Sequence, residues 1–275
     1  MTEIGIFVVP YADGHEAMTA QVLAADEAGL DYIAVQDHPY QRRFLDTWTL
    51  LAYLAARTRH VRLVPDVLNL PLRLPAMIAK AAMSLDLLTG GRVEIGLGAG
   101  AYWDAIEAMG GPRRTPKESV DAVEEALPIL RAYLAGEPSV TFEGHTYRVS
   151  GAKPGPSPPH SIGVWLGAYG PRMLALTGRL ADGWIPSLGG RFLAEDDVAP
   201  MQARIDDAAG RAGREPAEIK RVLNLMDPEP TPNRLRDRLL RVAELGFETI
   251  LVAVPDEDPL AFVRRLADDV VPRLP

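Results

Sequence analysis

Eight short apolar runs recur along the whole chain, separated by longer segments in which apolar residues are spaced three and four positions apart. The runs are almost continuously hydrophobic, as expected for strands that are buried on both faces of a parallel sheet. A strand followed by a helix, repeated eight times, is the pattern of an α/β protein of the (β/α)8 TIM-barrel type. We predict that fold, with strands at residues 4–9, 32–36, 61–67, 93–97, 162–167, 183–187, 221–225 and 250–254.

The repeat continues without a dividing linker, so residues 1–275 are predicted to form a single domain. The region of about 136–160, between the fourth helix and the fifth strand, is an insertion. There, Val-Thr-Phe and Thr-Tyr-Arg-Val flank a turn at Glu143-Gly144, which predicts a β-hairpin followed by a Pro/Gly/Ser-rich loop. In a TIM barrel, such an insertion matters mainly by shaping the mouth.

The composition excludes several classes of protein. The chain has no cysteine, which rules out a disulfide scaffold, a cysteine nucleophile and thiolate-bound metal sites. Its 29 basic and 37 acidic side chains give a net charge of −8, which argues against a nucleic-acid-binding surface. The first residues lack the positive charge of a signal peptide, and no apolar run reaches the ~18 residues of a membrane span. We therefore expect a cytoplasmic protein that does not bind membranes.

Catalytic groups of a TIM barrel follow the carboxyl ends of its strands, so these segments carry the candidates. The second predicted strand ends in Gln-Asp-His-Pro, which places His38 at the barrel mouth. Histidine is suited to moving protons because its unperturbed pKa lies near neutrality. A structural role, in which His38 bonds to a neighbouring loop and Asp37 holds it, is an equally good interpretation. The remaining histidines are expected to be surface residues: His15, His60, His145 and His160.

Glycine-rich turns follow two other strands. After the fourth strand, Gly98, Ala99 and Gly100 would let the backbone approach a flat or anionic ligand. A dinucleotide-binding Rossmann fold is excluded, because its fingerprint lies after the first strand and contains a further glycine and a later acid. After the fifth strand, residues 168–172 open a helix whose free N–H groups, with Arg172 beside them, would suit a phosphate. An ordinary tight turn explains the same residues equally well.

The third predicted strand carries two polar residues in an apolar run. Asp66 and Asn69 must meet partners in the core or at the mouth, because buried polar groups are normally hydrogen-bonded. No metal is expected, since the sequence contains neither His-x-His on a strand nor His-Glu-x-x-His. The Gly-x-Ser-x-Gly motif of a serine nucleophile is missing as well. A hydrolase or lyase is therefore disfavoured.

Three longer blocks resemble the luciferase-like monooxygenase family, whose members are TIM-barrel oxidoreductases that use FMN or the deazaflavin coenzyme F420. The blocks are GLDYIAVQDHPY at 29–40, the segment from VRLVPDVLNLP to VEIGLGAG at 61–100, and the segment from IGVWLGAYG to ADGWIPS at 162–187. The insertion containing TFEGHTYRV also falls where the family has one.

The resemblance implies a role for most of these candidates. His38 would lie beside the flavin ring as a proton donor or base, and Asp66-Val67 would form a bulge with a cis peptide that supports the ring. Tyr102 and Trp103 would line the substrate side, or serve only as packing residues. The other expected cofactor contacts are Asn69 at the ring or ribityl chain, Gly98, Ala99 and Gly100 along the cofactor, and Ala168, Tyr169, Gly170, Pro171 and Arg172 around its phosphate.

The resemblance further implies an enzyme that acts on a small organic substrate. With FMN, the primary expectation, a flavin reductase would supply the reduced cofactor and an oxygen atom would be inserted into the substrate. With F420, the alternative, a hydride would be transferred without oxygen. A flavin-binding relative that has lost catalysis is a further alternative.

Two departures and one helix refine this expectation. The F420-dependent sugar-phosphate dehydrogenases have an acidic and an aromatic residue where this chain has Ala101 and Arg42, so that activity is not expected. The helix predicted at 76–88 is rich in small residues, and family members usually form dimers through barrel helices. We therefore expect a homodimer.

Overall fold

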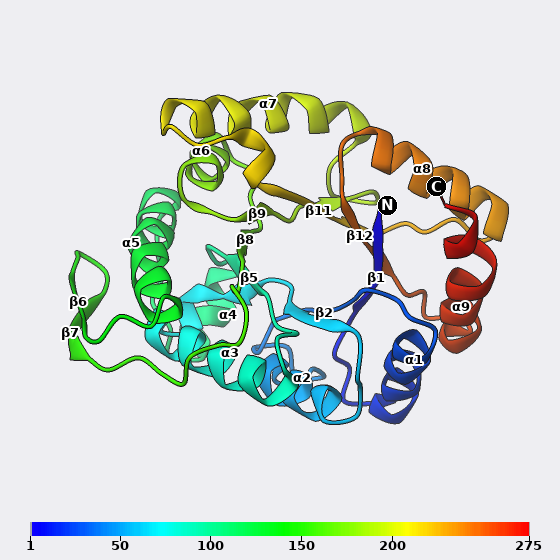
Figure 1. The fold of residues 1–275 in the computed structure, drawn as a ribbon, viewed down its shortest axis with the longest axis horizontal. Helices are drawn as coiled ribbons and strands as arrows, with labels where there is room; N and C mark the ends of the chain where they lie inside the picture. Colours follow the sequence, from blue (N-terminus) through cyan, green and yellow to red (C-terminus); the bar gives the residue numbers. More distant parts are fainter. Residues whose placement is uncertain (1, 275) are drawn as a thin grey trace.

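A computed structural model describes residues 2–274 and shows a nearly closed barrel of parallel strands with helices around it (Figure 1). Neighbouring strands follow the order β3-β2-β1-β12-β11-β9-β8-β5-β4. A parallel bridge between Leu63 in β3 and Val93, just before β5, spans the remaining gap. The predicted TIM barrel is thereby confirmed. Its strands are β1 (Glu3–Val8), β2 (Tyr32–Val35), β3 (Arg62–Pro65), β4 (Leu68–Asn69), β5 (Ile95–Gly98), β8 (Val164–Leu166), β9 (Gly183–Trp184), β10 (Ser187–Leu188), β11 (Lys220–Leu225) and β12 (Thr249–Ala253).

Helices cover the outside of the barrel and return the chain from one strand to the next (Figure 1). Local signals explain two of their starts: Pro75 is the first residue of α3, where its missing N–H is harmless, and Thr115 with Glu118 forms a capping box before α5. Among residues 2–274, no helix is both long and apolar enough to cross a membrane. The helices are α1 (His15–Glu27), α2 (Thr47–Ala55), α3 (Pro75–Thr89), α4 (Trp103–Ala108), α5 (Pro116–Leu134), α6 (Pro171–Leu180), α7 (Glu195–Arg211), α8 (Pro232–Glu244) and α9 (Pro259–Arg265).

Two of the predicted strands are interrupted. The run at 61–67 ends as a strand at Pro65, a cis peptide joins Asp66 to Val67, and pairing resumes in β4 against β5. The run at 183–187 divides into β9 and β10, with Pro186 between them, because proline has no N–H for a sheet ladder. The apolar runs by themselves did not indicate either interruption, although the family resemblance implied the one at Asp66-Val67.

The predicted hairpin lies between α5 and β8 and projects from the ring of helices (Figure 1). It consists of β6 (Val140–Glu143) and β7 (Arg148–Ala152). The carboxylate of Glu125 on α5 accepts hydrogen bonds from the backbone N–H groups of residues 145–147 in its turn. The hairpin is therefore held against α5.

Large side chains fill the inside of the barrel. Two glycines make room for them: a Cβ on Gly5 would lie 2.6 Å from the Cβ of Tyr32, and a Cβ on Gly183 would lie 2.6 Å from Cδ1 of Trp165. The interior is thus a packed core and not a pore, so a ligand is received at an end of the barrel. The interior residues are Phe7, Tyr32, Ala34, Val64, Trp165, Ile185, Val222 and Leu251.

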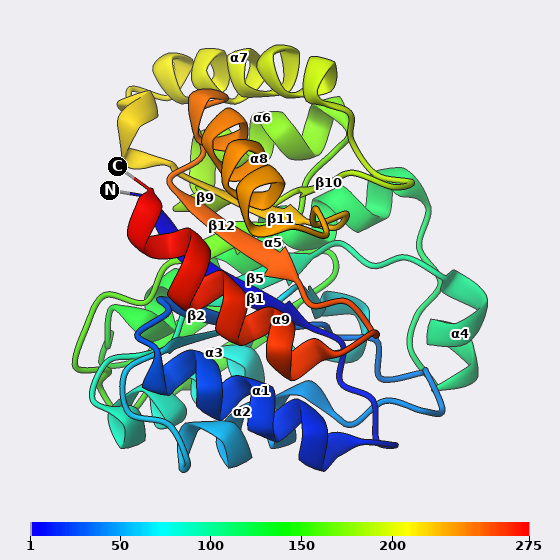
Figure 2. The same ribbon diagram turned by 90° about the vertical axis from the view of Figure 1, so that its right-hand side faces the viewer.

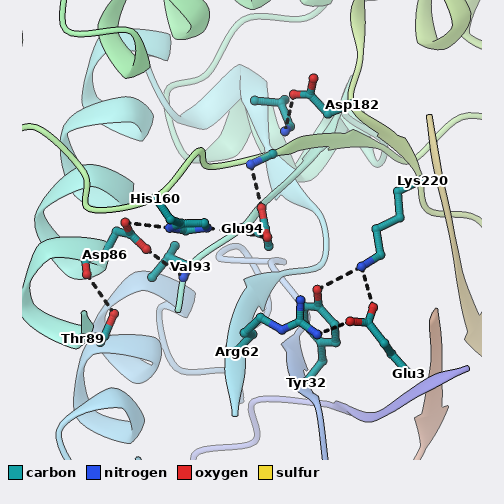
Figure 3. Close-up of polar contacts among 12 residues, drawn as sticks. Glu3, Tyr32, Arg62, Asp86, Thr89, Val93, Glu94, His160, Asp182 and Lys220 are labelled. Carbon is teal, nitrogen blue, oxygen red and sulfur yellow. Dashed lines mark hydrogen bonds and ion pairs between the residues drawn. The ribbon is translucent and has the colours of Figure 1, made fainter. Parts of the chain in front are cut away.

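Ion pairs close the amino-terminal end of the barrel (Figure 3). Glu3 pairs with Lys220 from β11 and with Arg62 from β3, and the ammonium group of Lys220 lies over the ring of Tyr32. Burial would raise the pKa of Glu3, but the hydrogen bonds from Lys220, Thr249 and Arg62 lower it to about 2. These contacts are expected to stabilise the barrel, because the amino-terminal end of a TIM barrel has a structural role.

His160, expected on the surface, is instead half-buried beside the same end (Figure 3). Its Nδ1 lies 2.9 Å from Oδ2 of Asp86 on α3, and Nε2 lies 3.7 Å from Glu94. His160 thereby joins the loop after the hairpin to α3 and to the start of β5.

Candidate active site

A cavity of about 320 Å³ lies at the carboxyl ends of β2, β4, β5 and β8. Figure 2 shows the strand arrows pointing to the side of the molecule on which the short helix α4 lies. The lining comes from the segments that follow these strands and from the first turn of α6. The lining residues are Asp37, His38, Val67, Leu68, Asn69, Gly98, Ala99, Gly100, Ala101, Gly167, Tyr169, Gly170 and Met173.

Most of the residues predicted to contact a cofactor meet in this cavity, although they come from separate parts of the chain. Those that line it are His38, Val67, Asn69, Gly98, Ala99, Gly100, Tyr169 and Gly170. Those outside its lining are Asp66, Tyr102, Trp103, Ala168, Pro171 and Arg172. Five lining residues were not predicted as site residues, although each is adjacent to a predicted one: Asp37, Leu68, Ala101, Gly167 and Met173. Within residues 2–274, no group of three or more His, Cys, Asp or Glu residues is placed to hold a metal ion.

Asp37 is the buried charge of this site. Its carboxylate accepts two hydrogen bonds from Arg73, from Nε at 2.8 Å and Nη2 at 2.7 Å, and one from the backbone N–H of Asn69 at 2.9 Å. A bidentate pair of hydrogen bonds from one guanidinium compensates the negative charge of a carboxylate that has no exposed surface. Asp37 thus fixes the segment from Asn69 to Arg73 against the end of β2. Sequence reasoning missed this pair, because no local pattern links two residues in different loops.

Val67, which follows the cis peptide, packs against glycines of two neighbouring strand ends. A Cβ added to Gly98 would lie 2.7 Å from Cγ2 of Val67, and one added to Gly167 would lie 3.1 Å from the same atom. Glycine at positions 98 and 167 therefore makes room for the Val67 side chain, a role that was not predicted from the sequence. The two glycines leave a surface of backbone and one branched side chain, against which a flat ring can lie. The cis peptide between Asp66 and Val67 is the one that the family resemblance implied.

Asn69 offers an unused acceptor at the cavity. Its side chain is buried, and its Oδ1 has no hydrogen-bond partner within the described residues. Buried amide oxygens are normally hydrogen-bonded, so an unpaired one on a residue that lines a cavity indicates a ligand with an N–H or O–H group. The backbone N–H of Asn69 is held by Asp37, which fixes the position of this acceptor.

His38 is half-buried at the edge of the cavity, next to two tyrosines. Its Nδ1 lies 2.7 Å from the hydroxyl of Tyr40, and the ring of Tyr102 stands edge-on to it at 5.6 Å between centroids. Burial lowers the pKa of His38; the charge of Asp37 opposes this effect and that of Arg191 adds to it. Burial also raises the pKa of Tyr40 to about 12, so this hydroxyl keeps its proton and can serve either tautomer of the neutral imidazole. The other ring nitrogen, Nε2, is left for a reacting group.

Tyr102 and Trp103 occupy different surroundings. Tyr102 is 53% exposed and stands beside His38 and Tyr40, so it is available to a substrate. Trp103 is half-buried, and its ring lies 3.0 Å from the point where a Cβ of Gly100 would be. Trp103 therefore packs against the turn after β5.

The start of α6 forms part of the cavity wall, but its arginine turns away. Gly170 precedes the helix and lines the cavity together with Met173. The guanidinium of Arg172 pairs with Asp121 of α5 at 2.7 Å. Of the predicted phosphate contacts, the structure brings the backbone at the helix start to the cavity, and not this guanidinium. Two further residues that were predicted to contact the phosphate also lie outside the lining. Ala168 is buried, and Pro171 is the exposed first residue of α6.

Most of the sequence matches a described protein family. The family model for luciferase-like monooxygenases covers residues 2–226. The chain belongs to the luciferase-like monooxygenase family. It is 26% identical to an F420-dependent glucose-6-phosphate dehydrogenase of Intrasporangium calvum, over 95% of each chain. It is 34% identical over 212 residues to a 5,10-methylenetetrahydromethanopterin reductase of Archaeoglobus fulgidus, which covers 77% of this chain and 60% of that one.

A solved structure agrees on the fold of this luciferase-like protein. An F420-dependent secondary alcohol dehydrogenase, in complex with an F420-acetone adduct, superposes with a TM-score of 0.88 over 98% of both chains, at 16% identity. The family resemblance inferred from the three sequence blocks is confirmed. An identity this low supports a shared barrel and leaves the substrate to be argued from the site.

Proposed function

We propose that the protein is an F420-dependent oxidoreductase that transfers a hydride between coenzyme F420 and a small organic substrate. The comparisons favour F420 over FMN, the cofactor that the sequence placed first, because the I. calvum dehydrogenase and the alcohol dehydrogenase are both named for F420. The observation that carries the proposal is the cavity in which His38, Val67 and Asn69 meet. Ala101 lines this cavity without an acidic group, so a sugar phosphate is not the proposed substrate.

The lining suits a flat ring system with a phosphate-bearing chain. Val67 and the backbone at Gly98 and Gly167 would lie against one face, and the unpaired Oδ1 of Asn69 would accept a hydrogen bond from a ring N–H. The N–H groups at the start of α6, after Gly170, would bind a phosphate. F420 bound here supplies two-electron hydride chemistry, which no protein side chain provides.

His38 would act on the proton of the substrate. When an alcohol is oxidised, its hydroxyl proton must leave as the hydride is removed, and a neutral histidine is a suitable acceptor. Burial keeps His38 largely neutral at pH 7, and the Tyr40 hydroxyl holds Nδ1, which leaves Nε2 to face the substrate. The ring of Tyr102 beside His38 would contribute an apolar wall for that substrate.

A side-by-side titration with F420 and FMN, each oxidised and reduced, tests the proposal through cofactor fluorescence. The expected result is tight binding of F420 and weak binding of FMN. Preferential binding of reduced FMN would contradict the choice of F420 and favour a monooxygenase, to which a separate flavin reductase supplies the cofactor. Binding of neither cofactor at high micromolar concentration would overturn the proposal.

Replacing Gly170 by tryptophan should close the cavity without disturbing the fold. Gly170 lines the cavity, has an ordinary φ of −77°, and a Cβ there would meet no atom within 4 Å. We expect the indole ring of Gly170→Trp to weaken cofactor binding at least about tenfold, or ~1.4 kcal/mol. Gly210→Trp is the control, since Gly210 on α7 also has open space around it and lies outside the lining. Equal cofactor affinities of the two variants would mean that the cofactor binds elsewhere.

We also propose a homodimer, and the exposed face of α3 supports it. Met77 and Leu88 are 60% and 82% exposed, and helical spacing aligns them with Ala81 and Ser84. Large apolar side chains exposed together indicate a contact surface. Leu88→Asp is expected to convert a dimer into a monomer in light scattering, whereas Met109→Asp, after α4, should leave the mass unchanged. A wild-type mass of one protomer would contradict this proposal.

A further inference from the structure

Asp66 carries a buried carboxyl group that has no cationic partner among the described residues. Within residues 2–274 its side chain receives one hydrogen bond, from Nδ2 of Asn224 to Oδ1 at 3.1 Å. In the part of the chain that the structure describes, its Oδ2 has no hydrogen-bond partner, and neither has Oδ1 of Asn224. None of the roles proposed above for the neighbouring residues involves this carboxyl group.

Another aspartate of this protein, Asp26, shows how hydrogen bonds can stabilise the charged form of a partly buried carboxylate. Asp26 accepts three backbone N–H groups from residues 59–61, and although burial would raise its pKa, these bonds lower it. Asp66 lacks such support, so burial raises its pKa to about 7 against the weaker, opposing effect of Asn224. Asp66 can therefore change its charge near neutral pH.

Asp66 lies immediately behind the cavity wall. Val67, the next residue, lines the cavity. On the other side, Nδ2 of Asn224 is 3.4 Å from Oγ of Ser187, and the N–H of Ser187 donates to the hydroxyl of Tyr169, a second lining residue. Asp66 is thus linked to the cavity wall through the adjacent Val67 and through the hydrogen-bonded chain from Asn224 to Tyr169. A charge in the cavity would interact strongly with a charge on Asp66, because the Asp66 carboxyl group is buried away from water.

We propose that Asp66 takes up one proton from solvent when the reduced, negatively charged cofactor binds in the cavity. This inference rests on the proposed function, since a reduced deazaflavin or flavin ring carries a negative charge near neutral pH. Two negative charges this close repel each other, so binding of the cofactor favours the neutral carboxyl group. By linkage, protonation of Asp66 strengthens cofactor binding to the same degree. The carboxylate gains one proton and becomes neutral, and no bond of the cofactor changes.

Two ionisable side chains that line the cavity, Tyr169 and His38, are expected to keep one protonation state between about pH 7 and 9. Tyr169, in the β8–α6 loop, has a pKa that burial raises, so its hydroxyl stays protonated. His38, after β2, has a pKa that burial lowers, so it is neutral in this range. Asp37, also after β2, is compensated by Arg73 in a buried ion pair. The side chains on the other side of Asp66 are uncharged: Asn224 on β11 donates to Asp66, and Ser187 on β10 contacts Asn224. The residues packed against Val67 are the glycines Gly98 on β5 and Gly167 after β8.

Calorimetric titration with reduced F420 at about pH 8, in buffers of different ionisation enthalpy, measures the protons taken up per cofactor bound. We expect the wild-type protein to take up about one proton more than Asp66→Asn, whose amide has nearly the same size and does not titrate. Between pH 7 and 9, the wild-type affinity should fall by up to about tenfold per pH unit relative to the affinity of the variant. Titration of the cofactor's own groups cancels in this comparison.

Asp13→Asn is the matched control, because the Asp13 carboxylate is 82% exposed. This variant should take up as many protons on cofactor binding as the wild-type protein does. Asp66→Ser is a second uncharged variant, for use if the amide disturbs folding. Equal proton uptake by the wild type and the Asp66 variants, with reduced F420 bound to all, would overturn the inference and leave the proposed function intact. Failure of the wild-type protein to bind either reduced F420 or reduced FMN would overturn both.

Discussion

His38→Ala is expected to lower turnover by about 10²–10⁴-fold, the usual contribution of a general acid or base. The affinity for the cofactor should change little, because Val67, Asn69 and the start of α6 remain in place. Burial lowers the pKa of His38, so the neutral, proton-accepting form persists below the ordinary value of 6.5. Wild-type substrate oxidation should therefore decline only as the pH falls through that lowered pKa, and the variant should lose this acid limb. Steady-state rates between about pH 5 and 8 measure both effects.

A matched histidine outside the site separates this role from a general effect of losing an imidazole. His145 lies in the turn of the hairpin, is exposed, and contacts Glu125 through its backbone N–H. His145→Ala should therefore retain wild-type turnover. Normal turnover of His38→Ala would show that the histidine is structural, as the alternative interpretation of the sequence holds. A wild-type protein that binds F420 tightly but neither oxidises nor reduces a substrate would instead be a cofactor-binding relative without catalysis.

The barrel could be predicted because parallel strands that are buried on both faces leave a simple trace in the sequence. Runs such as 4–9 and 250–254 are nearly all apolar, and each is followed by a segment whose apolar residues have the spacing of a helix. The break at Asp66 could not be predicted from that trace, since the surrounding residues stay apolar through Val67. At this break the Val67 side chain packs against Gly98 of β5 and Gly167 after β8, which are distant in the sequence.

The cavity was predictable in part, because the carboxyl ends of neighbouring parallel strands meet at one end of a barrel. This rule alone brings His38, Asn69 and Gly98 together. Side-chain direction does not follow from it: Arg172 stands at the predicted helix start, but its guanidinium turns to Asp121 on α5, which the sequence pattern cannot reveal. Ion pairs between residues of different loops cannot be predicted from the sequence pattern either.

The ion pair between Asp37 and Arg73 is such a pairing, and breaking it should have the largest effect on stability. Arg73→Met keeps the apolar stem of the side chain but removes both charge-assisted hydrogen bonds to a carboxylate that has no exposed surface. Removing one partner of a buried pair leaves an uncompensated charge and costs about 3–5 kcal/mol. For a chain of this size, we expect the melting temperature to fall by roughly 10 °C.

The same substitution should also weaken cofactor binding, because Asp37 holds the backbone N–H of Asn69 and thus the position of its free acceptor. Arg43→Met is the control: its pair with Asp13 is 67% and 82% exposed, and exposed pairs contribute less than about 1 kcal/mol. A loss of stability equal to that of the control would mean that this pair contributes little, and that other contacts hold the segment from Asn69 to Arg73 at the cavity.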